Sequence, residues 1–235
     1  MHETHPDLED TLSDDATLWR YMDLARFVDL LQTSELHLAR VDQMQDKWEG
    51  AYGPTNTALR PDIYGEHYAT MEDQFPRIAS YARTHVFLNC WHIADSESAA
   101  MWSVYDREGR GIAVKARKAD LLAGLVGDQK VHGFPVEYTD YSVQFISERN
   151  LLLPYMHKRL SFQHEQEYRL MVAMLDVQDT PTFLREKVDL SKAFEQVFVS
   201  PEAPGWFLKV IRRLVDQYGF GWTVQHSDLA SDPIY

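Results

Sequence analysis

The sequence is poor in cysteine, in positive charge and in long apolar runs. Its single cysteine, Cys90, excludes a disulfide within the chain. Acidic residues outnumber basic ones by 36 to 23, and the formal charge of −13 argues against general nucleic-acid binding, which needs a basic face. No apolar run approaches the roughly 20 residues of a membrane helix, and residues 1–10 do not resemble a signal peptide. These absences predict a cytoplasmic protein that binds no membrane.

Several standard motifs are also missing. The chain has no phosphate-binding loop ending in Gly-Lys-Ser/Thr and no Gly-x-Gly-x-x-Gly fingerprint. It has no Gly-x-Ser-x-Gly elbow for a hydrolase serine, and its ten histidines lack the His-x-x-x-His spacing of a zinc site. A catalytic site must therefore be sought among less standardised residues.

The composition that remains is that of a globular protein. Hydrophobic residues make up 45% of the chain and charged residues 25%, and 235 residues suffice for one large domain. Residues 1–16 are polar and acidic, which favours a flexible leader. We therefore expect a single domain over residues 17–235.

Hydrophobic periodicity predicts an α+β fold with a central mixed or antiparallel sheet flanked by helices. The opening reads as strand 17–22, a helix over 24–33 capped by Asp23, and strand 35–41. Residues 42–65 read as irregular. Further helices are expected over 67–83 (broken or kinked at Pro76), 96–105, 118–126, 150–158 and 206–218. Further strands are expected over 86–91, 112–116, 133–138, 168–174, 194–199 and 222–225.

The most informative stretch is the charged segment that leads into the strand at 168–174. Glu165 and Glu167 are two residues apart, so on a strand both carboxylates would project from one face. Like charges at that distance raise each other's proton affinity, which suits an acid or a base. Arg169 continues the face and could offset the repulsion. A purely structural Glu–Arg ladder is an equal alternative.

Three other segments carry candidate site residues. Arg20 lies within a short strand, where its guanidinium would suit a phosphate or carboxylate, or would pair with an internal acid. His92 and Tyr105 are the candidates for a cleft in an aromatic-rich stretch. Cys90 lies in an apolar run and is expected to be an inert core residue rather than a nucleophile assisted by His92. The loop 46–50 follows a strand, where functional groups often lie.

These segments in their order resemble a bacterial family known as domain of unknown function 2971, over residues 17–229. The matching motifs are Trp19-Arg20-Tyr21, Asp46-Lys47-Trp48-Glu49-Gly50, Cys90-Trp91-His92, Met101-Trp102-Ser103-Val104-Tyr105, Gly111-Ile112-Ala113-Val114 and the closing stretch from Arg159 to Arg169. Membership of this family implies no particular reaction.

A more distant resemblance is to ADP-ribosyltransferases, which share the strand–helix–strand opening, an Arg on the first strand and a late Glu-x-Glu strand. It implies that NAD is the substrate, that Arg20 binds its phosphates or ribose, and that Tyr21 or Tyr105 stacks on nicotinamide. Glu167 would be the catalytic carboxylate, and Glu165 would orient the acceptor. The middle strand departs from that family, because it reads Asn89-Cys90-Trp91-His92 where Ser-Thr-Ser is usual.

Three functions follow from these observations. The first is an NAD-using ADP-ribosyltransferase-like enzyme of a stress, toxin or phage-defence type, acting on an unidentified macromolecular acceptor. The second is a non-catalytic module that binds a nucleotide or a protein through an aromatic and basic cleft. The third is a metal-dependent nuclease that uses Asp46, Glu49, Glu165 and Glu167. The candidate ligand-binding residues are Arg20, Tyr21, His92, Tyr105 and Arg169.

Overall fold

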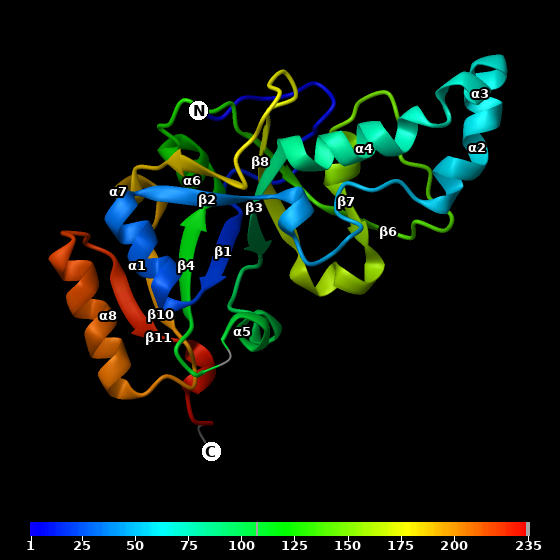
Figure 1. Ribbon diagram of the computed structural model, residues 1–235. Coiled ribbons are helices and arrows are strands. Elements are labelled where there is room, and N and C mark those ends of the chain that lie inside the picture. The colour runs from blue at the N-terminus through cyan, green and yellow to red at the C-terminus, as the bar shows by residue number, and fades with distance from the viewer. Residues whose placement is uncertain (107, 234–235) are drawn as a thin grey trace.

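The computed structural model describes residues 1–106 and 108–233, which form one α/β domain built on a mixed sheet flanked by helices (Figure 1). The strands are β1 (Thr17–Met22), β2 (Glu35–Arg40), β3 (Val86–Ile93), β4 (Ile112–Arg117), β5 (His132–Pro135), β6 (Glu137–Thr139), β7 (His157–Arg159), β8 (Glu167–Ala173), β9 (Phe183–Lys187), β10 (Gln196–Val199) and β11 (Thr223–His226). The α-helices are α1 (Leu24–Thr33), α2 (Pro54–Tyr64), α3 (Tyr68–Met71), α4 (Gln74–His85), α5 (Ala99–Tyr105), α6 (Lys118–Gly124), α7 (Leu190–Ala193) and α8 (Gly205–Gln217). Short 3₁₀ helices are η1 (Val41–Gln43), η2 (Gly65–His67), η3 (Leu153–Met156), η4 (Leu160–Glu165) and η5 (Asp228–Ala230).

The main sheet branches at β3. Within the described residues its order is β11-β10-β4-β1-β3-β2-β9, and β8 pairs along the length of β3 and carries β5 on its other side. All of these pairs are antiparallel except β10 with β11. The edge of β3 that faces away from β8 is shared, because β2 pairs with its first half and β1 with its last two residues. A fork therefore separates β1 from β2 beside Asn89 and Cys90.

The register puts different chemistry on the two faces of the sheet. Directly opposed residues of antiparallel strands point to the same side, so His92 and Glu167 share a face, as do Cys90 and Arg169. Arg20 alternates with Tyr21 and lies on the opposite face, over the ring of Trp91. The register of β1, β3 and β8 thus places Arg20 on the other face of the sheet from Glu167.

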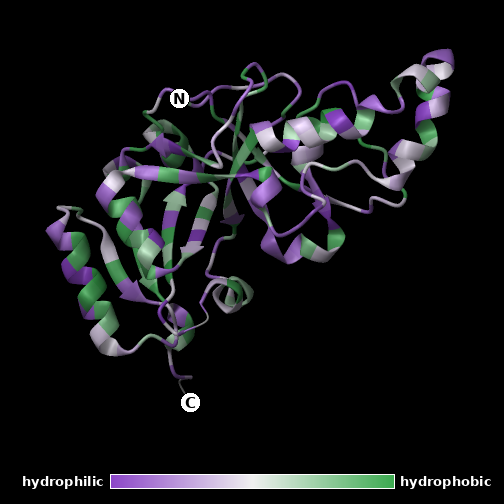
Figure 2. Cartoon of the chain, in the orientation of Figure 1, coloured by the Kyte–Doolittle hydropathy of each residue, from purple (hydrophilic) through white to green (hydrophobic). Residues whose placement is uncertain are grey.

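The elements with the clearest periodicity form close to where the sequence predicts them. The side chain of Asp23 accepts a hydrogen bond from the backbone N–H of Arg26 at 2.8 Å and caps α1. Helix α8 buries one apolar stripe, visible as green bands alternating with purple in Figure 2, through Phe207, Ile211 and Val215. These predictions were confirmed because one side of each element packs on the sheet.

Three local predictions were wrong. Residues 54–64, expected to be irregular, form α2, because Pro54 occupies the first helical turn, where a missing N–H costs nothing. Residues 150–158, expected to be helical, form turns, η3 and β7. The break expected at Pro76 occurs earlier, between α3 and α4, since Pro76 also fits a first turn. Helices α2 and α3 extend away from the sheet (Figure 1).

The acidic leader lies against the domain. Leu8 is buried, and His2 forms an isolated bridge with Val131. Asp10 accepts a hydrogen bond from the hydroxyl of Tyr168 at 2.8 Å. These contacts give residues 1–16 specific partners that composition did not predict.

In residues 1–106 and 108–233, no helix combines the length and the apolar character needed to span a bilayer.

Candidate functional site

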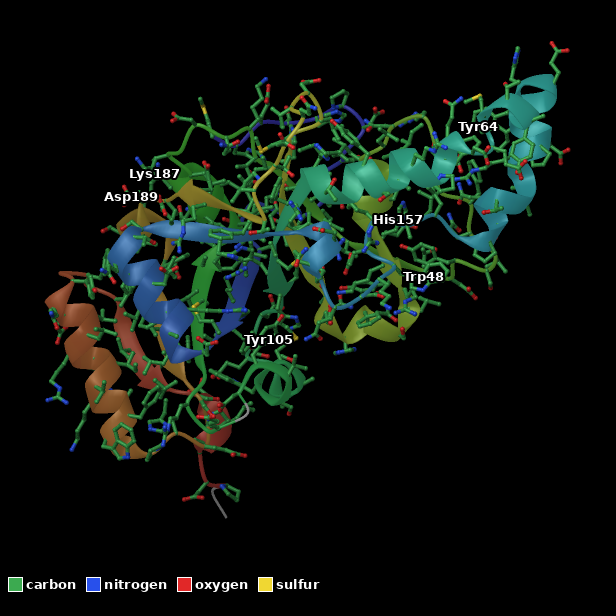
Figure 3. The ribbon with its side chains drawn as sticks, in the orientation of Figure 1. Trp48, Tyr64, Tyr105, His157, Lys187 and Asp189 are labelled. Atoms are coloured by element: carbon green, nitrogen blue, oxygen red, sulfur yellow. The ribbon has the colours of Figure 1, made fainter. Side chains whose placement is uncertain are left out.

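A cavity of about 850 Å³ lies between the N-terminal end of α1, the end of α5 and the segment from β7 to β8. Its wall includes Glu165, Glu167, Tyr105 and Cys90. Small-molecule sites commonly have volumes of roughly 300–1,000 Å³. The cavity is therefore large enough for a nucleotide-sized ligand. Figure 3 shows Tyr105 beside α5 on one side of this region and Trp48 beside η4 on the other.

A sharp turn brings the two carboxylates together. Glu165 ends η4, and Glu167 begins β8. Gln166, between them, has φ of 40° and ψ of 64°, a left-handed conformation that is unfavourable for a residue with a side chain. The two carboxylates therefore converge because of the turn at Gln166. The sequence prediction was based on strand alternation, which is not the cause.

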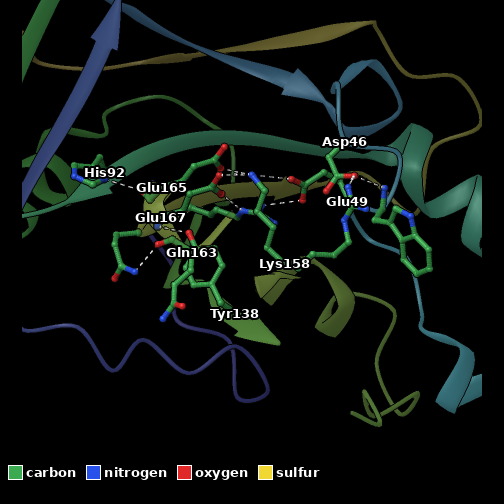
Figure 4. Close-up of polar contacts among 12 residues, drawn as sticks. Asp46, Glu49, His92, Tyr138, Lys158, Gln163, Glu165 and Glu167 are labelled. Atoms are coloured by element: carbon green, nitrogen blue, oxygen red, sulfur yellow. Dashed lines mark hydrogen bonds and ion pairs between the residues drawn. The ribbon is translucent and has the colours of Figure 1, made fainter. Parts of the chain in front are cut away.

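Lys158 is the common partner of both carboxylates. Its Nζ lies 2.6 Å from Oε1 of Glu167 and also donates a hydrogen bond to Oε2 of Glu165. A third carboxylate, Glu49, forms an ion pair with the same Nζ at 3.2 Å. Figure 4 shows the amine of Lys158 between Glu49 on one side and the Glu165–Glu167 pair on the other. Lys158 was not among the candidate site residues predicted from the sequence, and the segment that carries it was predicted to be helical.

A second cation lies behind the pair. Arg169 is completely buried, and its guanidinium contacts Oε2 of Glu167 at 2.7 Å and Oε2 of Glu49 at 2.8 Å. It also donates a hydrogen bond to the backbone carbonyl of Tyr155 at 2.7 Å. Arg169 is not part of the cavity wall. Arg169 contacts the carboxylates from within the core. The sequence prediction that it binds a ligand directly was therefore wrong.

The charges of this cluster do not balance. Glu49, Glu165 and Glu167 are three carboxylates, and Lys158 and Arg169 are two cations. Burial, together with the hydrogen bond to Glu167, raises the pKa of Glu165 to about 7. Burial also acts to raise the pKa of Glu167, but Arg169, Glu165 and Lys158 outweigh it and hold that pKa well below its usual range. Near neutral pH, Glu165 is thus protonated in about half of the molecules, while Glu167 is ionised.

The loop 46–50 delivers Glu49 to this cluster. Oδ1 of Asp46 pairs with the guanidinium of Arg159 at 2.7 Å and accepts a hydrogen bond from the backbone N–H of Trp48. Gly50 has φ of 69°, and a Cβ on it would lie 2.1 Å from the ring of Tyr155. Only glycine fits that position. The position of this loop after a strand pointed to Glu49 as a candidate residue. The sequence did not show that Lys158 and Arg169 are its partners.

The aromatic candidates divide into one exposed and one buried ring. Tyr105 is 43% exposed, lies in the cavity wall and stacks at 6.4 Å on Tyr21. Tyr21 is buried, packs edge-on against Trp102, and its hydroxyl accepts a hydrogen bond from the backbone N–H of Ser98. Tyr105 therefore has a free surface for a planar ligand, and Tyr21 supports it.

His92 lies behind Glu165. Its Nδ1 is 2.6 Å from the backbone carbonyl oxygen of Glu165 and must donate a proton to it, since that oxygen can only accept. Burial lowers the pKa of His92, which favours the neutral ring, and the hydrogen bond to Glu165 requires a proton on Nδ1. His92 is absent from the cavity wall and fixes the backbone of Glu165 instead.

Arg20 is not brought into the main cavity. It lines a neighbouring cavity of about 420 Å³ between α1, β1 and β2, and the two cavities share Asp23, Ala25 and Arg26 in their walls. Its guanidinium lies in the fork between β1 and β2, where it donates a hydrogen bond to the backbone carbonyl of Cys90 at 2.8 Å. Among the described residues Arg20 makes no ion pair, so the alternative prediction, that it pairs with an internal acid, was wrong.

Cys90 lines the main cavity, but its thiol is not activated. Burial and the charge of Glu167 raise the pKa of Cys90 to about 12. The nearby His92 is already bonded to Glu165 through Nδ1. A thiol with this pKa is almost entirely protonated at neutral pH and is a poor nucleophile.

No family model matches the chain, and no curated protein matches it in sequence. The site must therefore be interpreted from its own geometry. The described residues contain no group of three or more acidic, histidine or cysteine side chains arranged to hold a metal ion. The carboxylates named for a nuclease are instead paired with Lys158, Arg159 and Arg169.

Proposed function

We propose that this protein is an enzyme that cleaves the nicotinamide–ribose bond of NAD and transfers the ADP-ribosyl group, in the manner of an ADP-ribosyltransferase. One observation carries the proposal: a carboxyl pair, Glu165 and Glu167, faces a nucleotide-sized cavity, and near neutral pH Glu167 is ionised while Glu165 can take up or release a proton. Carboxyl pairs held in different protonation states are suited to acid–base chemistry at an acetal or N-glycosidic carbon.

Each carboxyl has a distinct role in this reaction. As the bond from the ribose carbon to nicotinamide breaks, positive charge develops on the ribose, and ionised Glu167 stabilises it. The acceptor then forms a bond to that carbon and loses a proton, which passes to Glu165. A base with a pKa near 7 is ionised in about half of the molecules at neutral pH and can receive that proton.

The cavity wall carries charges of both signs. Its inner part contains Glu49, Glu165 and Glu167 together with Lys158, and the carboxylates would face nicotinamide, which is a cation in NAD. In the outer part, the exposed Arg26 and Arg110 are the cations available to the pyrophosphate, and they lie among Asp23, Asp106 and Glu108. The free face of Tyr105 would stack on the nicotinamide ring.

The direct test is turnover of labelled NAD by the full chain, with protein extract as a source of acceptors. Glu167→Gln should lower the rate of nicotinamide release by about 10²- to 10³-fold. The matched control is Glu195→Gln, because Glu195 is exposed and lies in neither cavity wall. Absence of nicotinamide release by the wild-type protein would overturn the proposal, and tight NAD binding without release would favour a binding module.

A further inference from the structure

Two short strands enclose Glu167. β6 and β7 form a separate parallel pair in which Tyr138 lies opposite Lys158. The hydroxyl of Tyr138 accepts a hydrogen bond from the backbone N–H of Glu167 at 2.8 Å, while Lys158 binds its carboxylate. A three-residue strand such as β7 contributes little to a core. The position of β7 matters because it carries Lys158, whose side chain contacts Glu167.

The surroundings of Lys158 are almost closed to water. Lys158 is 6% exposed and Glu49 is 1% exposed. Burial acts to lower the pKa of Lys158, but Glu167 and Glu49 outweigh this effect and raise the pKa above its ordinary value. Lys158 is therefore a permanent charge in this cluster, and any change of protonation must occur on a carboxyl group.

We propose that Lys158, with Glu49 as its counter-charge, is the positioning residue of this site: it holds the two carboxyl groups together, keeps Glu167 ionised and makes Glu165 the member of the pair that gains and loses a proton. The catalytic role of Lys158 rests on the proposed function. Its effect on the protonation of Glu165 and Glu167 can be measured without turnover. Lys158 binds both groups through one nitrogen atom, so its charge is shared between them. Glu167 receives the second cation, Arg169, and Glu165 does not.

The charged and titratable groups around this proton come from several elements. Those facing Lys158 and the carboxyl pair are Glu49 from the loop after η1, Glu165 from η4, Glu167 and Arg169 from β8, Tyr138 from β6, Cys90 from β3 and Tyr105 from α5. His92 contacts only the backbone of Glu165. Of the carboxylates, Glu165 is the one with the most exposed side chain, at 21%, and can exchange its proton with the cavity.

The test is a carboxyl ¹³C NMR titration of the full chain, with the Glu165 signal assigned by its loss in Glu165→Gln. Lys158→Met should raise the pKa of Glu165 by about 1–3 units, because an opposite charge within contact distance has been removed. Glu49→Gln should lower it, since two carboxylates would then face two cations. Lys158→Arg keeps the charge and should leave the titration close to that of the wild type.

Opposite signs distinguish this mechanism from loss of structure. If Lys158 were only structural, Lys158→Met and Glu49→Gln would both let water in and shift the pKa of Glu165 the same way, toward its ordinary value. That result would overturn the proposal. If Lys158→Met does not fold, Lys158→Gln, which keeps a hydrogen-bond donor but no charge, replaces it: a higher pKa of Glu165 supports the proposal, and an unchanged or lower one refutes it.

The titration requires no turnover, so its result is independent of whether NAD is the substrate. If the wild-type protein releases nicotinamide, the pH at which its rate is half-maximal should shift with the same sign as the NMR titration in each variant. Turnover failure combined with the expected titration would remove the proposed reaction and retain the role of Lys158.

Discussion

Among the residues that the structure describes, two lysines are buried in acidic surroundings, and one of them, Lys158, lines the cavity of about 850 Å³. Lys118 begins α6 and pairs with Asp10 at 2.9 Å and Asp14 at 3.2 Å. Lys158 pairs with three glutamates. Strand β8 separates the two groups, because Tyr168 points toward Asp10 while Glu167 and Arg169 point toward Lys158.

The difference between the two lysines lies in the exposure of their acids. The side chain of Asp14 is 81% exposed, so water can solvate its charge. The side chains of Glu49 and Glu167 are at most 8% exposed, so the surplus charge at Lys158 must be compensated within the protein. Burial of a lysine therefore does not indicate function. An unbalanced, enclosed set of charges beside a cavity does.

The largest expected effect comes from disrupting the Lys158 cluster through its loop. In Gly50→Ala the new Cβ would collide with the ring of Tyr155, and the backbone conformation would be strained as well. We expect the free energy of unfolding to fall by about 2–5 kcal/mol in urea titrations. Gly219→Ala is the control, since Gly219 has φ of 79° but open space around it, and it should lose only about 1–2 kcal/mol. Equal losses would show that the contact with Tyr155 is unimportant.

An intermediate effect with opposite signs is expected when one acid is neutralised at each lysine. The folded-state pKa of Glu165 lies above its ordinary value, so the stability that its protonated form contributes below about pH 4.5 is lost as the pH rises to about 7. At pH 8, Glu165→Gln should therefore be more stable than the wild type by about 1–3 kcal/mol, and at pH 4 the two should agree. Asp10→Asn should lose about 1–3 kcal/mol at pH 8, because it weakens contacts to Lys118 and Tyr168. Destabilisation by both changes at pH 8 would contradict the distinction between the clusters.

The smallest effect is expected at Cys90, which shares the cavity of Lys158 but carries no charge. Because its pKa is raised to about 12, iodoacetamide at pH 8 should label it at least about 10²-fold more slowly than a small free thiol. Cys90→Ser should leave nicotinamide release within about threefold of the wild-type rate. Rapid labelling together with loss of turnover would identify Cys90 as a nucleophile and contradict the mechanism based on the carboxyl pair.

The sequence predicted those parts of the fold whose structure is determined by residues close to one another in the chain. The alternation over residues 35–40, the cap at Asp23 and the apolar stripe of α8 each depend on neighbours within a few positions. Local rules failed over residues 54–64 and 150–158, where proline and short turns depend on what packs against them. Glu165 and Glu167 were found from their spacing, although the turn at Gln166 brings them together for a different reason.

By itself, the sequence determined that this chain forms an α+β domain with a pair of glutamates ahead of a buried strand, because hydrophobic periodicity and charge are properties of the chain alone. Only the tertiary structure decided what surrounds that pair. The sequence already placed Arg169 beside Glu167, but Lys158 and Glu49 lie in segments with no regular pattern, and the fold brings them to the pair. Strand register places Arg20 on the other face of the sheet, beside a different cavity.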